Sequence, residues 1–130
     1  MTESKVPEGL RYAKSHEWVR VEGETVTVGI TDHAQAQLTD IVFADLPAEG
    51  KAAKTGATVM VLESVKTVAD IYAPGDGAVV EANAELRTHP EFVNQDPYGK
   101  GWLFRLHLTG PLDPTLLDPA AYRALLATEG

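Results

Sequence analysis

The sequence predicts a mainly β protein with a short internal helix and helices at its C-terminal end. Short runs of β-branched or alternating residues recur along most of the chain, separated by glycine, proline and polar turn signals. After the last run, two Asp-Pro pairs and a stretch rich in alanine and leucine are typical of helices. This order, strands first and helix last, predicts a β core that a terminal helix covers.

The first elements are a β-hairpin and a short helix. Residues 17–22 and 25–28 alternate in character and flank Gly23-Glu24, a compact hairpin signal. Thr31-Asp32 offer a capping side chain before 33–38, which predicts a short helix there. The next elements are predicted in this order: strand 41–46, turn 47–50, the two strands within 58–72, turn 73–77, strand 77–82 and strand 102–108.

The segment 58–72 predicts a hairpin with a lysine at its tip. Valine and isoleucine in its two arms favour a pleated backbone, and Glu63, Ser64, Lys66 and Thr67 form a polar break between them. A lysine there projects into water on a flexible four-carbon stem, and its primary amine can be acylated. Lys66 is therefore a candidate attachment point for a carboxylic acid cofactor, although most lysines are only solvated surface residues.

The C-terminal part, about 112–128, is predicted to be helical. Asp113-Pro114 and Asp118-Pro119 each offer an N-cap followed by proline at the first helical position. We expect this segment to pack on the β core through Tyr122, Leu125 and Leu126.

Composition narrows the function classes. The 130 residues predict one domain, 1–130, and no apolar stretch reaches the length of a membrane span. The absence of cysteine excludes a disulfide scaffold, a thiolate metal site and a cysteine nucleophile. A formal charge of −8, from 11 Lys and Arg against 19 Asp and Glu, opposes binding to nucleic acid or anionic membranes. The same charge suits transient docking on basic protein surfaces, or only keeps the chain in solution.

The first seven residues lack the features of a signal or transit peptide, so a cytoplasmic location is expected.

Several short motifs in this order resemble one known family. They are Ser15-His16-Glu17-Trp18, residues 29–35, Leu46-Pro47, Leu62-Glu63-Ser64-Val65-Lys66, Ala73-Pro74, Val93-Asn94, Pro97-Tyr98-Gly99 and Gly101-Trp102. Together they resemble the H protein of the glycine cleavage system over almost the whole chain. The resemblance implies the barrel-sandwich hybrid fold of lipoyl and biotinyl carriers. Two positions depart from the family pattern: Thr39 replaces an expected glycine, and Gly75-Asp76 replace part of a Pro-x-Ser-Gly run.

The resemblance also implies a function without catalysis. Lys66 would carry lipoic acid in amide linkage, installed by a lipoate ligase or a lipoyl/octanoyl transferase. The arm would take the aminomethyl group of glycine from a pyridoxal-phosphate glycine decarboxylase to a tetrahydrofolate-dependent aminomethyltransferase. It would then pass electrons to dihydrolipoamide dehydrogenase. An alternative is an H-like protein that donates lipoyl groups to 2-oxoacid dehydrogenase complexes, since both roles need the same lysine.

Further site residues come from the same resemblance. Glu63 matches a position for recognition by the lipoylating enzyme, and Ser15, Glu17, Ile30 and Asp70 match positions around the cleft that shelters the loaded arm. Both acids near the hairpin, Glu63 and Asp70, equally fit plain surface residues.

Other readings of the sequence are weaker. His16 and His33 lie seventeen positions apart, outside any ligand motif, and are expected to be structural. A biotin carrier would have methionines beside the lysine, where this chain has Val65 and Thr67. A lipoyl domain of a 2-oxoacid dehydrogenase would be shorter and followed by a linker to further domains. A hydrolase or metalloenzyme would need a nucleophile or a cluster of metal ligands, and no such motif is found in this sequence.

Overall fold

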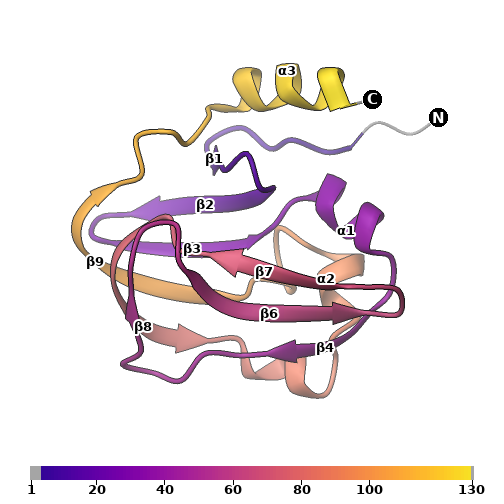
Figure 1. Ribbon diagram of the computed structural model, residues 1–130, viewed down its shortest axis with the longest axis horizontal. Coiled ribbons are helices and arrows are strands. Elements are labelled where there is room, and N and C mark those ends of the chain that lie inside the picture. Colours follow the sequence, from indigo (N-terminus) through magenta and orange to yellow (C-terminus); the bar gives the residue numbers. More distant parts are fainter. Residues whose placement is uncertain (1–3, 130) are drawn as a thin grey trace.

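The computed structural model describes residues 4–129, and within this range the strands form two antiparallel sheets (Figure 1). The larger sheet has six strands in the order β1-β2-β3-β9-β8-β5, and the smaller has three in the order β4-β6-β7. The strands are β1 (Arg11–Tyr12), β2 (Glu17–Glu22), β3 (Thr25–Ile30), β4 (Ile41–Asp45), β5 (Ala52–Ala53), β6 (Thr58–Ser64), β7 (Val68–Tyr72), β8 (Gly75–Ala82) and β9 (Phe104–Leu112). The helices are α1 (Asp32–Leu38), the 3-10 helix η1 (Ala84–Arg87), α2 (Phe92–Gln95) and α3 (Pro119–Glu129). The mainly β fold class with a short internal helix is confirmed.

The first hairpin runs two residues further than its pattern predicts. β3 continues through Gly29 and Ile30, which pair with Trp18 and Glu17 of β2. A Cβ on Gly29 would lie 2.5 Å from the indole of the fully buried Trp18. Glycine at this position therefore allows the strand to pack directly against the indole ring. The helix after it begins as expected, because the Thr31 side chain caps α1 by accepting a hydrogen bond from the Ala34 amide.

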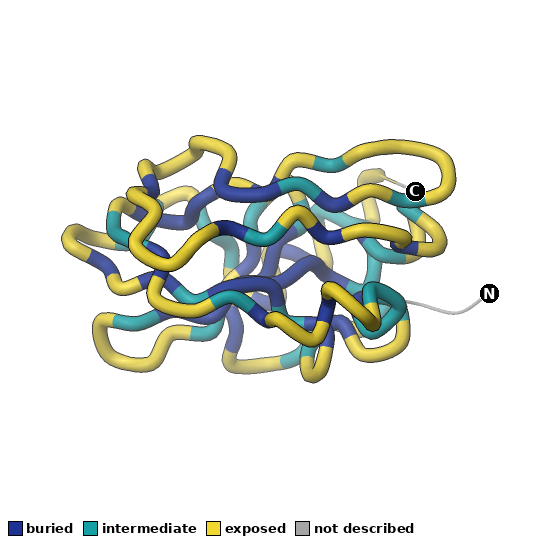
Figure 2. The backbone as a smooth tube through the Cα atoms, turned by 90° about the horizontal axis from the view of Figure 1, so that it is seen from below, coloured by how far each residue is buried: buried dark blue, intermediate teal, exposed yellow. Residues whose placement is uncertain are grey.

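The main core lies between the two sheets. Val26 and Leu106 of the larger sheet, and Leu62 and Ile71 of the smaller one, are almost fully excluded from solvent. Figure 2 shows the buried segments gathered in the interior, with exposed loops around them. Burial of each such side chain contributes roughly 1.5–3 kcal/mol, which holds the smaller sheet and its hairpin in place.

The C-terminal helix covers a second apolar cluster on the outer side of the larger sheet (Figure 1). The Tyr122 ring stacks on the Tyr12 ring at 4.5 Å, and Leu125 and Leu126 pack against the same cluster. The expected packing of this helix through these three residues is therefore confirmed. Asp118 caps the helix by accepting a hydrogen bond from the Ala121 amide at 2.8 Å.

The start of this helical segment differs from the prediction. Residues 112–118 are not helical, because β9 extends to Leu112 and α3 begins only at Pro119. The Asp113 carboxylate accepts hydrogen bonds from the amide and hydroxyl of Thr115, which closes a turn instead of capping a helix. Leu117 then forms a β-bridge with Tyr12, an extended geometry that excludes a helix at this point.

The predicted turn at 73–77 is largely strand. β8 begins at Gly75 and pairs with β9, with Gly75 opposite Leu112 and Gly77 opposite Leu108. A Cβ on Gly77 would lie 2.1 Å from the His107 carbonyl oxygen, so this glycine permits close approach of two strands at a bulge. The composition of the segment suggested a turn, whereas its glycines serve strand packing.

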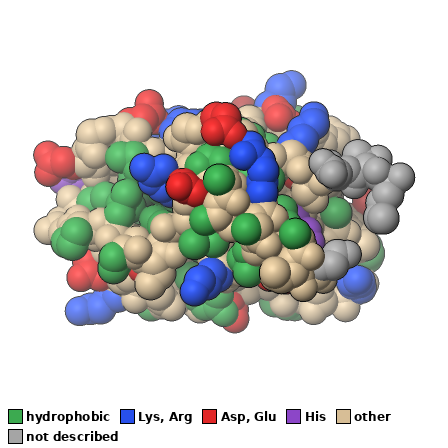
Figure 3. Space-filling model, turned by 90° about the horizontal axis from the view of Figure 1, so that it is seen from above, with side chains coloured by type: hydrophobic (Ala, Val, Ile, Leu, Met, Phe, Trp, Pro, Cys, Tyr) green, Lys and Arg blue, Asp and Glu red, His purple; other side chains and the backbone are tan. Residues whose placement is uncertain are grey.

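The two single-turn helices, η1 and α2, were not predicted. Each has four residues, too few to show a helical period. No helix within residues 4–129 is long and apolar enough to cross a membrane. On the face that carries α3, acidic and basic side chains are interspersed with hydrophobic ones (Figure 3).

Candidate functional site

The hairpin of β6 and β7 presents Lys66 at its tip. Glu63 pairs with Val68 across the last register position, and residues 64–67 form the turn. The Ser64 hydroxyl accepts hydrogen bonds from the amides of Lys66 and Thr67, and the Ser64 amide donates to the Thr67 carbonyl at 2.8 Å. Lys66 is exposed. The hydrogen bonds of the turn therefore fix the backbone of Lys66, while its side chain extends into solvent.

A second contact fixes the hairpin from outside. The Val65 amide donates to the carbonyl of Asp40, in the turn between α1 and β4, at 3.0 Å. Asn94 of α2 holds that turn, because its side chain accepts from the Ile41 amide at 2.9 Å and donates to the Thr39 carbonyl at 2.8 Å. The position of the lysine thus depends on elements far from it in sequence.

Glu63 lies in an exposed row with apolar neighbours. Phe43 of β4 and Val68 of β7 flank it across the smaller sheet, and they are 49% and 60% exposed. Val65, in the turn itself, is 65% exposed. Large apolar side chains in this degree of exposure around a charged group are typical of a surface that contacts another protein.

One pocket lies between α1 and β7, beside the hairpin. Its volume is about 190 Å³, and its lining includes Ser15, Ile30 and Asp70. The structure therefore brings together three of the residues expected around a sheltering cleft. His16, Ala34 and Leu38 complete part of its wall.

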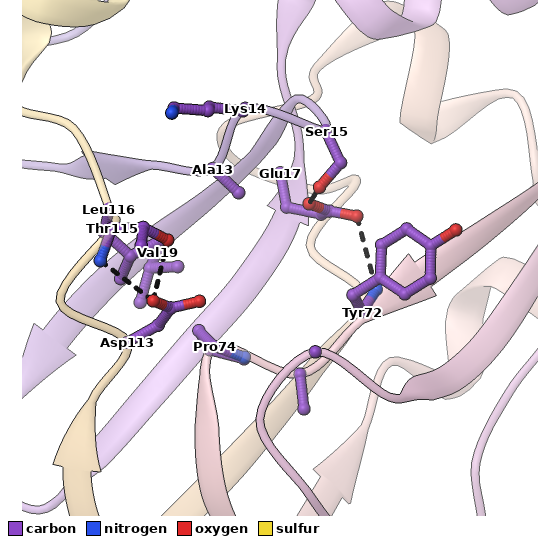
Figure 4. A pocket seen from close by; sticks show the side chains of 12 residues that line it. Ala13, Lys14, Ser15, Glu17, Val19, Tyr72, Pro74, Asp113, Thr115 and Leu116 are labelled. Carbon is purple, nitrogen blue, oxygen red and sulfur yellow. Dashed lines mark hydrogen bonds between the residues drawn. The ribbon is translucent and has the colours of Figure 1, made fainter.

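Glu17 lies at a different pocket, of about 270 Å³, which it lines together with Ser15 (Figure 4). Its side chain is only 2% exposed, accepts a hydrogen bond from the Ser15 hydroxyl, and accepts one from the Tyr72 amide at 3.2 Å. Burial raises the pKa of the Glu17 carboxyl, while these two hydrogen bonds act in the opposite direction. Ser15 borders both pockets, so the expected cleft residues are divided between two hollows that share this serine.

His16 and His33, expected to be structural, lie side by side despite their separation in sequence. Their ring centroids are 4.7 Å apart, and Nδ1 of His16 lies 2.8 Å from the Tyr122 hydroxyl.

The sequence analysis named Ser64 and Asn94 only as members of motifs, and it did not predict the contacts that they make. Ser64 closes the lysine turn, and Asn94 holds the neighbouring turn. Serine at the first position of a four-residue turn is a known turn signal, because its hydroxyl accepts from amides two or three residues ahead, and this signal would have indicated the role of Ser64. Nothing local to Asn94 indicates its partners, which lie more than fifty positions away.

Comparison with known proteins gives a consistent result. The family model described as glycine cleavage H-protein matches residues 10–129. A glycine cleavage system H protein from Symbiobacterium thermophilum is 52% identical over 93% of this chain and 95% of its own. One from Thermus thermophilus is 51% identical over 95% of this chain and 98% of its own. The crystal structure of a glycine cleavage system H protein from Mycobacterium marinum superposes with a TM-score of 0.85 at 35% identity, covering 94% and 99% of the two chains. The chain therefore belongs to the glycine cleavage H-protein family.

Proposed function

We propose that this chain is the lipoyl carrier of a glycine cleavage system and is not itself a catalyst. It carries the aminomethyl group of glycine from the decarboxylase to the aminomethyltransferase, and then electrons to dihydrolipoamide dehydrogenase. The observation that carries the proposal is the exposed Lys66 at the tip of a hairpin whose turn is closed by Ser64. Family membership supports it.

The residues at the tip suit an amide-linked lipoyl group. The clamped turn fixes the Cα of Lys66, so only the side chain and its attached group swing, and a tethered group has a high local concentration at each partner. A lipoyl group, when attached, supplies a reversible sulfur couple, which a chain without cysteine lacks.

The exposed row on the smaller sheet is our proposed contact for the lipoylating enzyme. Glu63 offers a charge between Phe43 and Val68, so one partner surface can pair with the carboxylate and cover both apolar groups. Glu63→Gln should slow attachment at Lys66 while leaving the fold unchanged, because the side chain is exposed.

The pocket beside the hairpin is our proposed resting place for the arm. Ser15, Ile30 and Asp70 line it, which combines a hydroxyl, an apolar wall and a carboxylate able to pair with an ammonium group. Glu17 lines the neighbouring pocket and orients Ser15, because its carboxylate accepts a hydrogen bond from the Ser15 hydroxyl.

Intact mass spectrometry tests the proposal directly. Incubation with lipoate ligase, ATP and lipoate should add one lipoyl group, and Lys66→Arg should abolish the addition. Lys54→Arg is the matched control, since Lys54 is also exposed and lies in the turn before β6. Addition that persists in the Lys66 variant, or that is lost in the Lys54 variant, would contradict the assignment.

A further inference from the structure

Three side chains with ligand atoms converge between α1, the end of α3 and the loop before β2. Nε2 of His16 lies 3.0 Å from Oε1 of Glu129, and Nε2 of His33 lies 3.6 Å from the same oxygen. All three ligand atoms lie within 4.8 Å of one another. The side chains of His16 and His33 are only 14% and 18% exposed, and that of Glu129 is 34% exposed.

A hydrogen-bond chain orients the His16 ring. Thr31 Oγ1 accepts from the Ala34 amide and lies 2.7 Å from the Tyr122 hydroxyl, which in turn lies 2.8 Å from Nδ1 of His16. When the tyrosine donates to Thr31, its oxygen accepts from Nδ1–H of His16, and the lone pair of His16 lies on Nε2, facing Glu129. This is the tautomer that a metal ion at this place requires. A buried partner on the far nitrogen is how proteins orient histidines that ligate metals.

One of the converging atoms has no hydrogen-bond partner. Nε2 of His33 is buried and makes no hydrogen bond, since the carboxylate oxygen 3.6 Å away is too far. Imidazole nitrogens that present lone pairs beside a carboxylate are able to bind a metal cation.

The spacing also suits a metal ion. Zinc bonds of about 2.0–2.1 Å in tetrahedral geometry place neighbouring ligand atoms about 3.3 Å apart. Two of the three separations between ligand atoms, 3.0 and 3.6 Å, lie on either side of this value, and the third is no more than 4.8 Å.

We infer that His16, His33 and Glu129 form a binding site for a divalent transition-metal ion of the zinc class, which ties the end of α3 to α1. Two imidazoles and one carboxylate suit zinc, copper or nickel, whereas magnesium prefers oxygen ligands alone. The fourth position is left for water. Binding at this place joins the C-terminal helix to the wall of the pocket that contains Ser15 and Asp70, because His16 also lines it.

Calorimetric titration of zinc chloride into tag-free, unlipoylated protein tests this site, since lipoyl thiols would bind zinc themselves. One ion per chain should bind and raise the melting temperature, and magnesium chloride should do neither. His33→Gln and Glu129→Gln should each weaken zinc binding at least tenfold and remove the rise in melting temperature. Tyr122→Phe, which keeps the ring stacked on Tyr12, should weaken binding less than loss of a ligand does.

The matched control is His89→Gln. His89 and Glu91 also form a histidine and carboxylate pair, with 3.0 Å between Nδ1 and Oε2, but both are exposed and neither belongs to the cluster. This variant should bind zinc as the parent protein does. No zinc binding by the parent protein, or binding that His33→Gln and Glu129→Gln leave unchanged, would overturn the inference. Equal weakening by His89→Gln would overturn it as well, since it would indicate scattered surface binding. Melting curves in EDTA establish that each variant is folded.

Discussion

Thr39 adopts a backbone conformation that suits glycine, and Thr39→Gly should therefore stabilise the protein. Thr39 ends α1 with φ 64° and ψ −154°. This region of backbone space is almost restricted to glycine, and a side chain there costs about 1–3 kcal/mol. The surrounding contacts impose the strain, because the Thr39 amide donates to the Gln35 carbonyl and the Thr39 carbonyl accepts from the Asn94 side chain. The glycine that the resemblance implied for this position agrees with that geometry.

The expected magnitude follows from two opposing terms. Relief of strain contributes about 1–3 kcal/mol, and the greater freedom of glycine in the unfolded chain costs about 0.4–1 kcal/mol. The hydroxyl of Thr39 bonds only the Leu38 carbonyl at the surface, so its loss changes little. The free energy of unfolding should rise by about 0.5–2 kcal/mol, or roughly 2–8 °C in melting temperature for a chain of this size.

Urea unfolding and thermal melts measure the effect, with Thr88→Gly as the matched control. Thr88 also ends a helical turn at the surface, and its hydroxyl also bonds a nearby carbonyl, but its φ is −104°. Glycine there should lower the free energy of unfolding by roughly 0.5–1 kcal/mol. A Thr39→Gly protein that melts at or below the parent temperature would refute the strain argument. So would equal shifts in both variants.

Three further predictions concern buried or half-buried groups. Gly29→Ala should lower the free energy of unfolding by about 1–3 kcal/mol, because its Cβ would displace the Trp18 indole, and urea unfolding followed by tryptophan fluorescence reports both effects. Glu17→Ala leaves the Ser15 hydroxyl and the Tyr72 amide without their acceptor and should cost about 1–3 kcal/mol in the same assay. If Glu17 also protects the aminomethyl-loaded protein, the variant should release ammonia faster without the aminomethyltransferase, and equal release rates would leave it only a structural role. Burial raises the pKa of Tyr98 from 10.0 to about 12. The stability that Tyr98 contributes is therefore complete below about pH 10 and is lost as the pH rises through about 12, and Tyr98→Phe should flatten that part of a stability profile.

The lysine hairpin was predictable because its signals are local. Alternating β-branched residues define both arms of 58–72, and a polar break marks the turn, so the pattern alone placed Lys66 at an exposed tip. The α1 cap at Thr31 and the α3 cap at Asp118 are equally local, since each side chain bonds an amide three residues ahead. The terminal helix was predicted to begin too early because Asp113-Pro114 has the same local signature as a true cap.

The sequence by itself determined the β class, the short helix after the first hairpin and the exposed lysine, because periodicity, turn residues and caps act over a few positions. Only the tertiary structure decided which residues line each pocket near that lysine and which residues hold its hairpin in position. It placed Glu17 at one pocket and Asp70 at another, and it brought Asn94 onto the turn at Thr39. It also brought His16 and His33 to Glu129, at the far end of the chain. These contacts join residues from 17 to 113 positions apart, and they exist only once the packed sheets and α3 have fixed the distances between elements.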